Sequence, residues 1–246
     1  MAARQTILVV ASHMDDAWYG VGGLALDAVG KGHRVVFLNT VGDLSHWPVT
    51  QGREAELLTQ VRAFAEDRGI EIRFLGYGYE RVPDDLGCMI SIAEVCDDVQ
   101  ADILFYHWPE DTNRDHATSG RAAPYACMHA PALLGRKAHA VSQAYAFQMD
   151  SQCRSFHGSV YYDITATLPE TLRVLGEIDS IYAQPWGGDA VTAIVDCLAT
   201  GQRLELTAHA AQKYALAITR GAECWVKYAE CYYPLRTPIA SQVLAL

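Results

Sequence analysis

Two short polar segments interrupt an apolar pattern in the first half of the chain, and both are rich in residues that bind metal ions or move protons. The first, residues 12–16, holds one histidine and two aspartates, and the second, residues 110–116, ends on His116. A catalytic zinc site takes three histidine or carboxylate ligands and keeps a further position open. His13, Asp16 and His116 offer such a set, with zinc as the expected ion and another divalent metal as the alternative. Asp15 is then left to act as the general base that takes a proton from the attacking water.

Both polar segments follow stretches whose composition predicts β-strands. Apolar runs rich in β-branched residues alternate with stretches of helical periodicity. Strands are expected at residues 7–11, 34–40, 70–75 and 102–107, and helices at residues 22–29, 53–68 and 87–99. This series predicts a Rossmann-like, doubly wound α/β fold with a mostly parallel sheet and helices on both faces. The first and fourth strands are expected to be neighbours, so the two polar segments would meet in the crevice where such folds bind ligands.

The second half of the chain has a weaker pattern. The expected elements are a helix at 117–128, strands at 144–148 and 160–165, a helix at 169–183, a mostly helical segment at 189–220 and an aromatic closing stretch at 225–233. No linker, repeat or low-complexity tract divides the 246 residues. The sequence therefore predicts a single domain over residues 1–246, with a helical C-terminal part from about residue 167.

Composition excludes several classes of function. The formal charge of −10 and the lack of a basic run argue against a nucleic-acid partner. No apolar run approaches the roughly 18 residues of a membrane span, and the first run is too short for a signal peptide. The seven cysteines are scattered without a CxxC pair, which predicts reduced thiols. We therefore expect a cytoplasmic protein that acts on a small molecule without a membrane partner, and the sequence is compatible with a homo-oligomer.

Four elements of the sequence resemble, in order and spacing, the motifs of the PIG-L/LmbE-like N-acetylglucosamine deacetylases. Residues 11–16 (Ala-Ser-His-Met-Asp-Asp), followed by Gly20, Gly22 and Gly23, resemble the family motif AHPDDE-x-x-x-GG. Residues 113–116 (Asn-Arg-Asp-His) resemble the family motif HPDH. Arg53 with Glu54 resembles the start of a family helix, and residues 162–165 (Tyr-Asp-Ile-Thr) resemble a later family strand. The resemblance extends over most of the chain. It implies a Rossmann-like fold, in agreement with the periodicity.

The resemblance also implies a function. Family members are zinc-dependent hydrolases that remove an N-acetyl or other N-acyl group from an amino sugar or a glucosamine-containing conjugate. By this resemblance His13, Asp16 and His116 bind the metal and Asp15 is the base. Arg53 binds substrate or orders the site, or else it is an exposed residue of a helix start. Two alternatives stay open: a metal-dependent amidase acting on a non-sugar amide, and a catalytically weak relative that binds sugar or metal.

Three residues depart from the family motifs. Met14 replaces a proline, Ala17 replaces an acidic residue, and Asn113 replaces the first histidine of HPDH. An asparagine donates a hydrogen bond to an oxyanion but does not transfer a proton. Asn113 is therefore expected to assist the reaction as a hydrogen-bond donor, and a different group must protonate the leaving amine. The candidates are Asp15 after it has taken the water proton, His107, His129 and His157.

Overall fold

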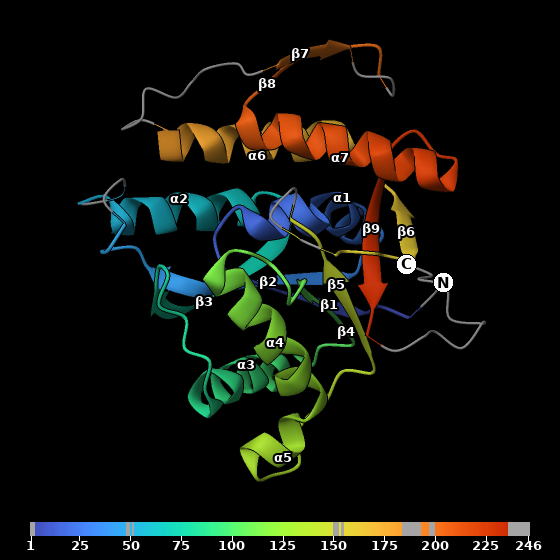
Figure 1. The fold of residues 1–246 in the computed structure, drawn as a ribbon. Helices are drawn as coiled ribbons and strands as arrows, with labels where there is room; N and C mark the ends of the chain where they lie inside the picture. The colour runs from blue at the N-terminus through green and yellow to red at the C-terminus, as the bar shows by residue number, and fades with distance from the viewer. Residues whose placement is uncertain are drawn as a thin grey trace.

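The computed structural model describes residues 3–47, 50, 52–149, 153, 155–183, 193–196 and 200–235. Within these residues a seven-stranded sheet runs through the molecule in the order β3-β2-β1-β4-β5-β9-β6 (Figure 1). Its parallel strands are β1 (Thr6–Ala11), β2 (Arg34–Asp43), β3 (Ile70–Gly78), β4 (Ile103–His107) and β5 (Gln143–Phe147). The remaining strands, β9 (Ala229–Pro234) and β6 (Val160–Asp163), form antiparallel pairs at one edge. The prediction of a doubly wound, mostly parallel α/β fold is confirmed.

Strands β1 and β4 lie side by side in the middle of the sheet. Every residue of β4 and all but the first of β1 are buried, which explains why both read as continuous apolar runs. Their register places Leu8 opposite Leu104 and Val10 opposite Tyr106. Parallel neighbours end at the same edge of a sheet. The chain therefore leaves β1 and β4 at adjacent points, where the two polar segments begin.

Helices cover both faces of the sheet (Figure 1). One face carries α1 (Asp16–Gly30) and α2 (Glu54–Glu66), and the other carries α3 (Leu86–Val99), α4 (Arg114–Met128) and the short α5 (Ala130–Leu134). The two remaining helices, α6 (Leu168–Ala183) and α7 (Ala208–Cys224), pack against each other, and α6 contacts α1. They form an outer layer on the side of α1 and α2.

The expectation of a mostly helical segment at residues 189–220 is wrong in part. Residues 189–192 and 197–199 lie outside the described residues, but β7 (Ala193–Asp196) and β8 (Arg203–Leu206) pair as an antiparallel hairpin before α7 begins. In β8, polar and apolar residues alternate as Arg-Leu-Glu-Leu, a period of two that favours a strand. The turn between the strands contains Gly201 with φ of 68°. A hairpin and a single helix therefore replace one long helical segment.

Helix α1 is held in place by a buried carboxylate and by close approaches at two glycines. Glu230 on β9 accepts hydrogen bonds from the backbone N–H groups of Gly23 (2.9 Å) and Leu24 (3.0 Å) and pairs with Lys213 at 2.7 Å. A Cβ atom at Gly20 would lie 2.2 Å from the Phe147 ring, and one at Gly23 would also clash with its neighbour. The glycines of the first motif thus let α1 approach the sheet closely, which fixes the N-terminus of the helix.

Two further sequence predictions concern membrane spans and cysteines. No helix among the described residues is long and apolar enough to cross a membrane. The six cysteines in these residues are free thiols, as the sequence predicts.

Candidate metal centre

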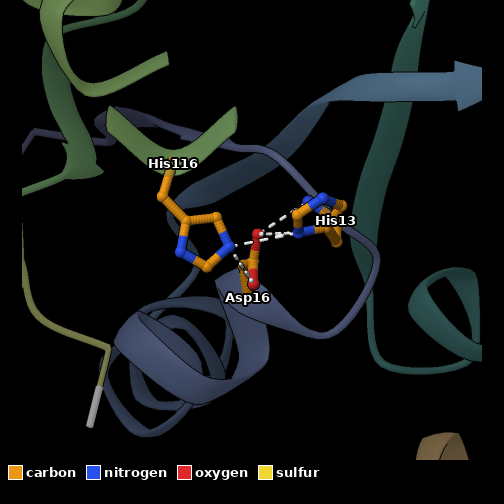
Figure 2. Close-up of side chains that lie close together, drawn as sticks. All are labelled: His13, Asp16 and His116. Carbon is orange, nitrogen blue, oxygen red and sulfur yellow. Dashed lines mark hydrogen bonds and ion pairs between the residues drawn. The ribbon is translucent and has the colours of Figure 1, made fainter. Parts of the chain in front are cut away.

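The loop after β1 and the first turns of α1 and α4 bring the three candidate metal ligands together (Figure 2). Nδ1 of His13 lies 3.1 Å from Nε2 of His116 and 3.3 Å from Oδ2 of Asp16. Oδ1 of Asp16 lies 3.3 Å from the same His116 nitrogen. The Asp16 and His116 side chains are buried, and that of His13 is 13 % exposed. The three residues expected from the sequence therefore converge on one partly accessible point.

Asp16 is fixed in orientation by the loop that precedes it. Its Oδ2 accepts hydrogen bonds from the backbone N–H groups of Ser12 (3.2 Å) and His13 (2.6 Å). Burial by itself would raise the pKa of Asp16, but the neighbouring imidazoles of His116, His13 and His107 outweigh burial and hold this pKa well below its ordinary value. Asp16 is therefore an ionised carboxylate with little freedom to turn.

Each imidazole has a carboxylate on its far nitrogen. Oδ2 of Asp111 lies 3.1 Å from Nδ1 of His116, and Oδ2 of Asp115 lies 3.3 Å from Nε2 of His13. Asp115 is held by the backbone N–H groups of Glu80 and Val82 at 2.7 and 3.2 Å. Carboxylates behind ligand imidazoles set the tautomer and make the facing nitrogen a better electron donor.

This supporting role of Asp111 and Asp115 was not predicted from the sequence, although both belong to the second polar segment. The available signal was their type and position next to a candidate ligand, since an imidazole that binds metal usually has an acceptor behind it. The backbone donors at Glu80 and Val82 follow β3 and gave no signal, because backbone groups of any residue type can fill that role.

The charges around the two imidazoles favour a bound cation. Burial would lower the pKa of His13, but Asp16 and the hydrogen bonds to Asp115 and Asp16 raise it to about 9. Burial would also lower the pKa of His116, but Asp16 and Asp111 raise it to about 10. Asp111 and Asp115 both have a lowered pKa, because their histidine partners outweigh burial. Three ionised carboxylates therefore surround the two imidazoles and favour positive charge between them.

His107 is one of the histidines considered as a proton donor. It is fully buried next to the cluster of the three candidate ligands (His13, Asp16 and His116). Its ring stacks on His116 with centroids 4.2 Å apart, and its Nε2 lies 3.0 Å from the Ser12 nitrogen and 3.1 Å from Asp16. Burial and the nearby His116 lower the pKa of His107 to about 4. His107 is thus neutral at pH 7. Its contacts with His116 and Asp16 help to hold these two side chains in place. It does not suit the role of proton donor to a substrate.

Asp15 and Asp16 are adjacent carboxylates with opposite electrostatic environments. Asp15 is the N-cap residue of α1, and its side chain is 16 % exposed. Burial and the charge of Asp16 raise the pKa of Asp15, whereas the pKa of Asp16 is lowered. Two carboxylates whose pKa values are pushed apart suit different roles in acid–base chemistry. Asp16 has the properties of a ligand, and Asp15 has those of a group that exchanges protons.

Asn113 and Arg53 occupy helix starts. Oδ1 of Asn113 accepts hydrogen bonds from the backbone N–H groups of Asp115 (2.9 Å) and His116 (3.3 Å) and so caps α4. Arg53 is the N-cap residue of α2, and its guanidinium pairs with Glu56 at 3.3 Å. Within the described residues no hydrogen bond or ion pair joins Arg53 to the cluster, so its substrate-binding role stays a prediction.

An aromatic pair lies beside the cluster. The Tyr79 ring lies 5.1 Å from that of His13, and the Trp47 ring stacks on Tyr79 at 5.4 Å with an interplanar angle of 12°. Both aromatic residues are half-buried. Trp18 in α1 and Trp108 after β4 are buried, and Trp186 lies outside the described residues. Trp47 and Tyr79 therefore form an apolar wall next to the most exposed of the three candidate ligands.

Solved structures with the same fold have different activities. N,N'-diacetylchitobiose deacetylase from Pyrococcus horikoshii has a TM-score of 0.70 at 15% identity, covering 96% of this chain and 88% of that chain. The 4-carboxy-2-hydroxymuconate hydratase GalB from Pseudomonas putida KT2440 has a TM-score of 0.73 at 19% identity, covering 97% and 99%. The conserved protein TT1542 from Thermus thermophilus has a TM-score of 0.71 at 18% identity, covering 96% and 99%. At these identities the similarity establishes the fold alone.

Sequence comparison matches the first half of the chain to a known family. No curated protein sequence matches the chain significantly. The PIG-L family model, described as GlcNAc-PI de-N-acetylase, matches residues 8–127. That stretch contains both polar segments and all three side chains that converge on one point. Residues 8–127 therefore match the PIG-L family.

Proposed function

We propose that the protein is a metal-dependent N-deacetylase, which hydrolyses the N-acetyl or another N-acyl group of an amino sugar or a glucosamine-containing conjugate. The observation that carries the proposal is the convergence of His13, Asp16 and His116, with a carboxylate behind each imidazole. The match of residues 8–127 to the PIG-L family model supports de-N-acetylation as the type of reaction. Zinc is the proposed ion, and another divalent metal is the alternative.

The donor set fits a divalent ion of the size and preference of zinc. The ligand atoms of His13, Asp16 and His116 are separated by 3.1 to 3.3 Å. A tetrahedral zinc with bonds of about 2.0–2.1 Å holds neighbouring ligand atoms about 3.3 Å apart. Two neutral imidazoles and one carboxylate also leave a position for water or substrate, as catalytic sites require. We therefore propose these three residues as the metal ligands.

The residues around the ion divide the chemistry between them. A divalent ion in this site would polarise the amide carbonyl and make water more acidic. The Asp15 carboxylate accepts a proton from the attacking water, while Asp16 remains ionised and keeps its orientation. The side-chain amide nitrogen of Asn113, whose oxygen is committed to the α4 cap, donates a hydrogen bond to the oxyanion that forms at the acyl carbon. Cleavage of the amide C–N bond then requires a proton at the nitrogen.

The aromatic wall supports a substrate with a ring. Trp47 and Tyr79 present half-buried apolar surface next to His13, and a sugar ring can pack its C–H face against such side chains. The P. horikoshii protein of the same fold is a deacetylase of N,N'-diacetylchitobiose, an acetylated disaccharide. An N-acetylated sugar is therefore the proposed small-molecule partner, and Arg53 is retained as the proposed substrate-binding arginine.

The test combines metal analysis with product detection. The purified protein is expected to contain about one divalent ion per chain and to release free amine and acetate in equal amounts from one or more members of a panel of N-acetylated sugars and conjugates. An N-acylated amine without a sugar serves as the comparison substrate. A protein that binds no divalent ion, or that binds one and hydrolyses no member of the panel, would contradict the proposal.

A second candidate reaction is addition of water to a carbon–carbon double bond. The observation that favours it is the similarity in fold to the hydratase GalB, which spans nearly the whole of both chains. The same cluster would activate water for that reaction, but no amine would be released. The two candidates are separated by incubating the protein with unsaturated hydroxy acids and following the loss of their ultraviolet absorbance.

A further inference from the structure

A histidine from the C-terminal helix approaches the proposed base. His209 lies in the first turn of α7, and its Nδ1 is 3.9 Å from Oδ2 of Asp15. The His209 side chain is 42 % exposed, although it lies next to the partly buried Asp15. The residue is 93 positions beyond the last candidate ligand in the sequence, and no motif of the first half of the chain points to it.

The His209 ring is held from the side by a carboxylate of the neighbouring helix. Asp179 of α6 hydrogen-bonds Nδ1 through its Oδ1, and its Oδ2 accepts a hydrogen bond from the His209 backbone nitrogen at 3.2 Å. Thr207, the N-cap residue of α7, makes no side-chain cap, so Asp179 fills part of that role from another helix. Within the described residues Nε2 of His209 has no hydrogen-bond partner. One ring nitrogen is thus fixed, and the other is available to a ligand.

The other candidate proton donors have unsuitable positions. His107 is fully buried, and its ring stacks on that of His116. His129 follows the last residue of α4, whereas His116 lies in its first turn, and a rise of 1.5 Å per residue separates them by about 20 Å. His157 is exposed and packs edge-on against Trp108, with ring centroids 5.7 Å apart. His209, in contrast, has a ring nitrogen 3.9 Å from the proposed base and a second one that is available.

We propose that His209, oriented by Asp179, is the general acid that protonates the leaving nitrogen of the substrate; this inference rests on the proposed hydrolase function. The hydrogen bond to Asp179 raises the pKa of His209 to about 9, so the ring carries the required proton at neutral pH. An imidazole whose Nδ1 is held by an aspartate is a common arrangement for proton transfer at Nε2. The proton that Asn113 is unable to supply thus comes from a different helix.

The proposed step conserves atoms and charge. Water gives its hydroxyl to the acyl carbon and one proton to Asp15. The amide C–N bond then breaks, and His209 gives a proton to the departing nitrogen, so that the amine leaves in its neutral form. Asp15 then releases its proton and Nε2 of His209 regains one by exchange with solvent, to which both side chains are partly exposed. The net reaction consumes one amide and one water and yields one amine and one carboxylic acid.

The test exploits the dependence of a general acid on the leaving group. An N-acetylated sugar has a poor leaving group that needs a proton, whereas 4-nitrophenyl acetate has a good leaving group that departs without one. His209→Ala is expected to lose about 10²-fold or more of kcat on the N-acetylated sugar, the usual size of a general-acid contribution. The same variant is expected to keep its kcat on the ester within about threefold. Metal content should not change. Asp179→Asn is expected to show a smaller loss with the same pattern.

His129→Ala is the matched control, since it removes an exposed imidazole far from the cluster. The inference is overturned if His209→Ala loses both activities equally, which indicates a structural role, or if it loses neither, which leaves Asp15 to return the proton itself. A melting temperature within a few degrees of the wild-type value checks that the variant folds, and His209→Gln provides a second variant that keeps polar contact with Asp179. Failure of the wild-type protein on both substrates would instead contradict the proposed function.

Discussion

Asp111 stands directly behind His116, with its Oδ2 3.1 Å from Nδ1 on the side of the ring opposite the nitrogen that faces Asp16. Asp111 is itself fixed by the backbone N–H of Asn113 at 2.8 Å. The ring therefore cannot turn without breaking this contact, and Nε2 is held toward the point where the three candidate ligands meet. The geometry of the cluster therefore depends on the loop between β4 and α4, which contains Asp111 and Asn113.

Asp111→Asn is expected to weaken metal binding. The asparagine keeps an acceptor for the His116 ring but removes the negative charge that makes this imidazole a stronger donor. Loss of such a partner typically lowers metal affinity about 10- to 100-fold. The affinity is measured by competition with a chromophoric chelator. Asp84→Asn, which removes an exposed carboxylate paired with Arg121, is the control and should bind metal like the wild-type protein.

His116→Ala is expected to abolish stoichiometric metal binding and activity together. A three-ligand site that loses one imidazole does not hold its ion in catalytic geometry. Metal is quantified by elemental analysis after gel filtration, and His13→Ala should give the same result. Full metal occupancy in either variant would remove that residue from the ligand set, whereas His209→Ala should retain its metal.

Asp15→Asn is expected to separate metal binding from chemistry. The variant keeps the ligands, so its metal content should equal that of the wild-type protein. Its turnover should fall about 10²-fold or more, because an amide does not accept the water proton. Steady-state release of amine measures the effect. A variant with nearly unchanged turnover would show that another residue acts as the base.

Asn113 has two separable roles, and two substitutions distinguish them. Asn113→Ala removes the α4 cap and is expected to cost about 1 kcal/mol of unfolding free energy as well as turnover. Asn113→Asp keeps a capping oxygen but replaces the N–H donor with an acceptor, so it should fold with near wild-type stability and still lose turnover. Urea denaturation and kinetics measure the two effects. Equal turnover in Asn113→Asp and wild type would place Asn113 outside the reaction.

The His209–Asp179 pair predicts a pH dependence of stability. The hydrogen bond to Asp179 raises the pKa of His209 to about 9, from its ordinary value of 6.5. The folded protein therefore binds this proton more tightly than the unfolded chain. The resulting stabilisation is fully present below about pH 6.5 and is lost as the pH rises through about 9. Melting temperatures of wild type and Asp179→Asn, measured across this window, should differ most at its acidic end. A difference that is constant with pH would show that His209 does not carry this proton linkage.

The sequence predicts the main features of the fold and the meeting of the candidate ligands. Continuous apolar runs at β1 and β4 indicate buried parallel strands, and the rule that ligands bind at the carboxyl ends of such strands brings the two polar segments together. His13 and Asp16 lie close after the end of one strand, so local chain geometry suffices to place them. The placement of the candidate ligands thus depends on short sequence motifs and on the pairing of β1 with β4.

Only the tertiary structure decides which groups surround the ligands. Asp115 is held by backbone N–H groups after β3, and His209 reaches Asp15 because α7 packs against α6 and α6 against α1. The β7–β8 hairpin before α7 was not predicted, although the period of two in β8 indicates a strand. Contacts of this kind depend on the packing of helix layers and on backbone groups that carry no residue identity. A periodic pattern specifies which face of a helix is buried, but it does not specify which other helix that face meets. For this reason the sequence motifs give no sign of His209, the proposed general acid.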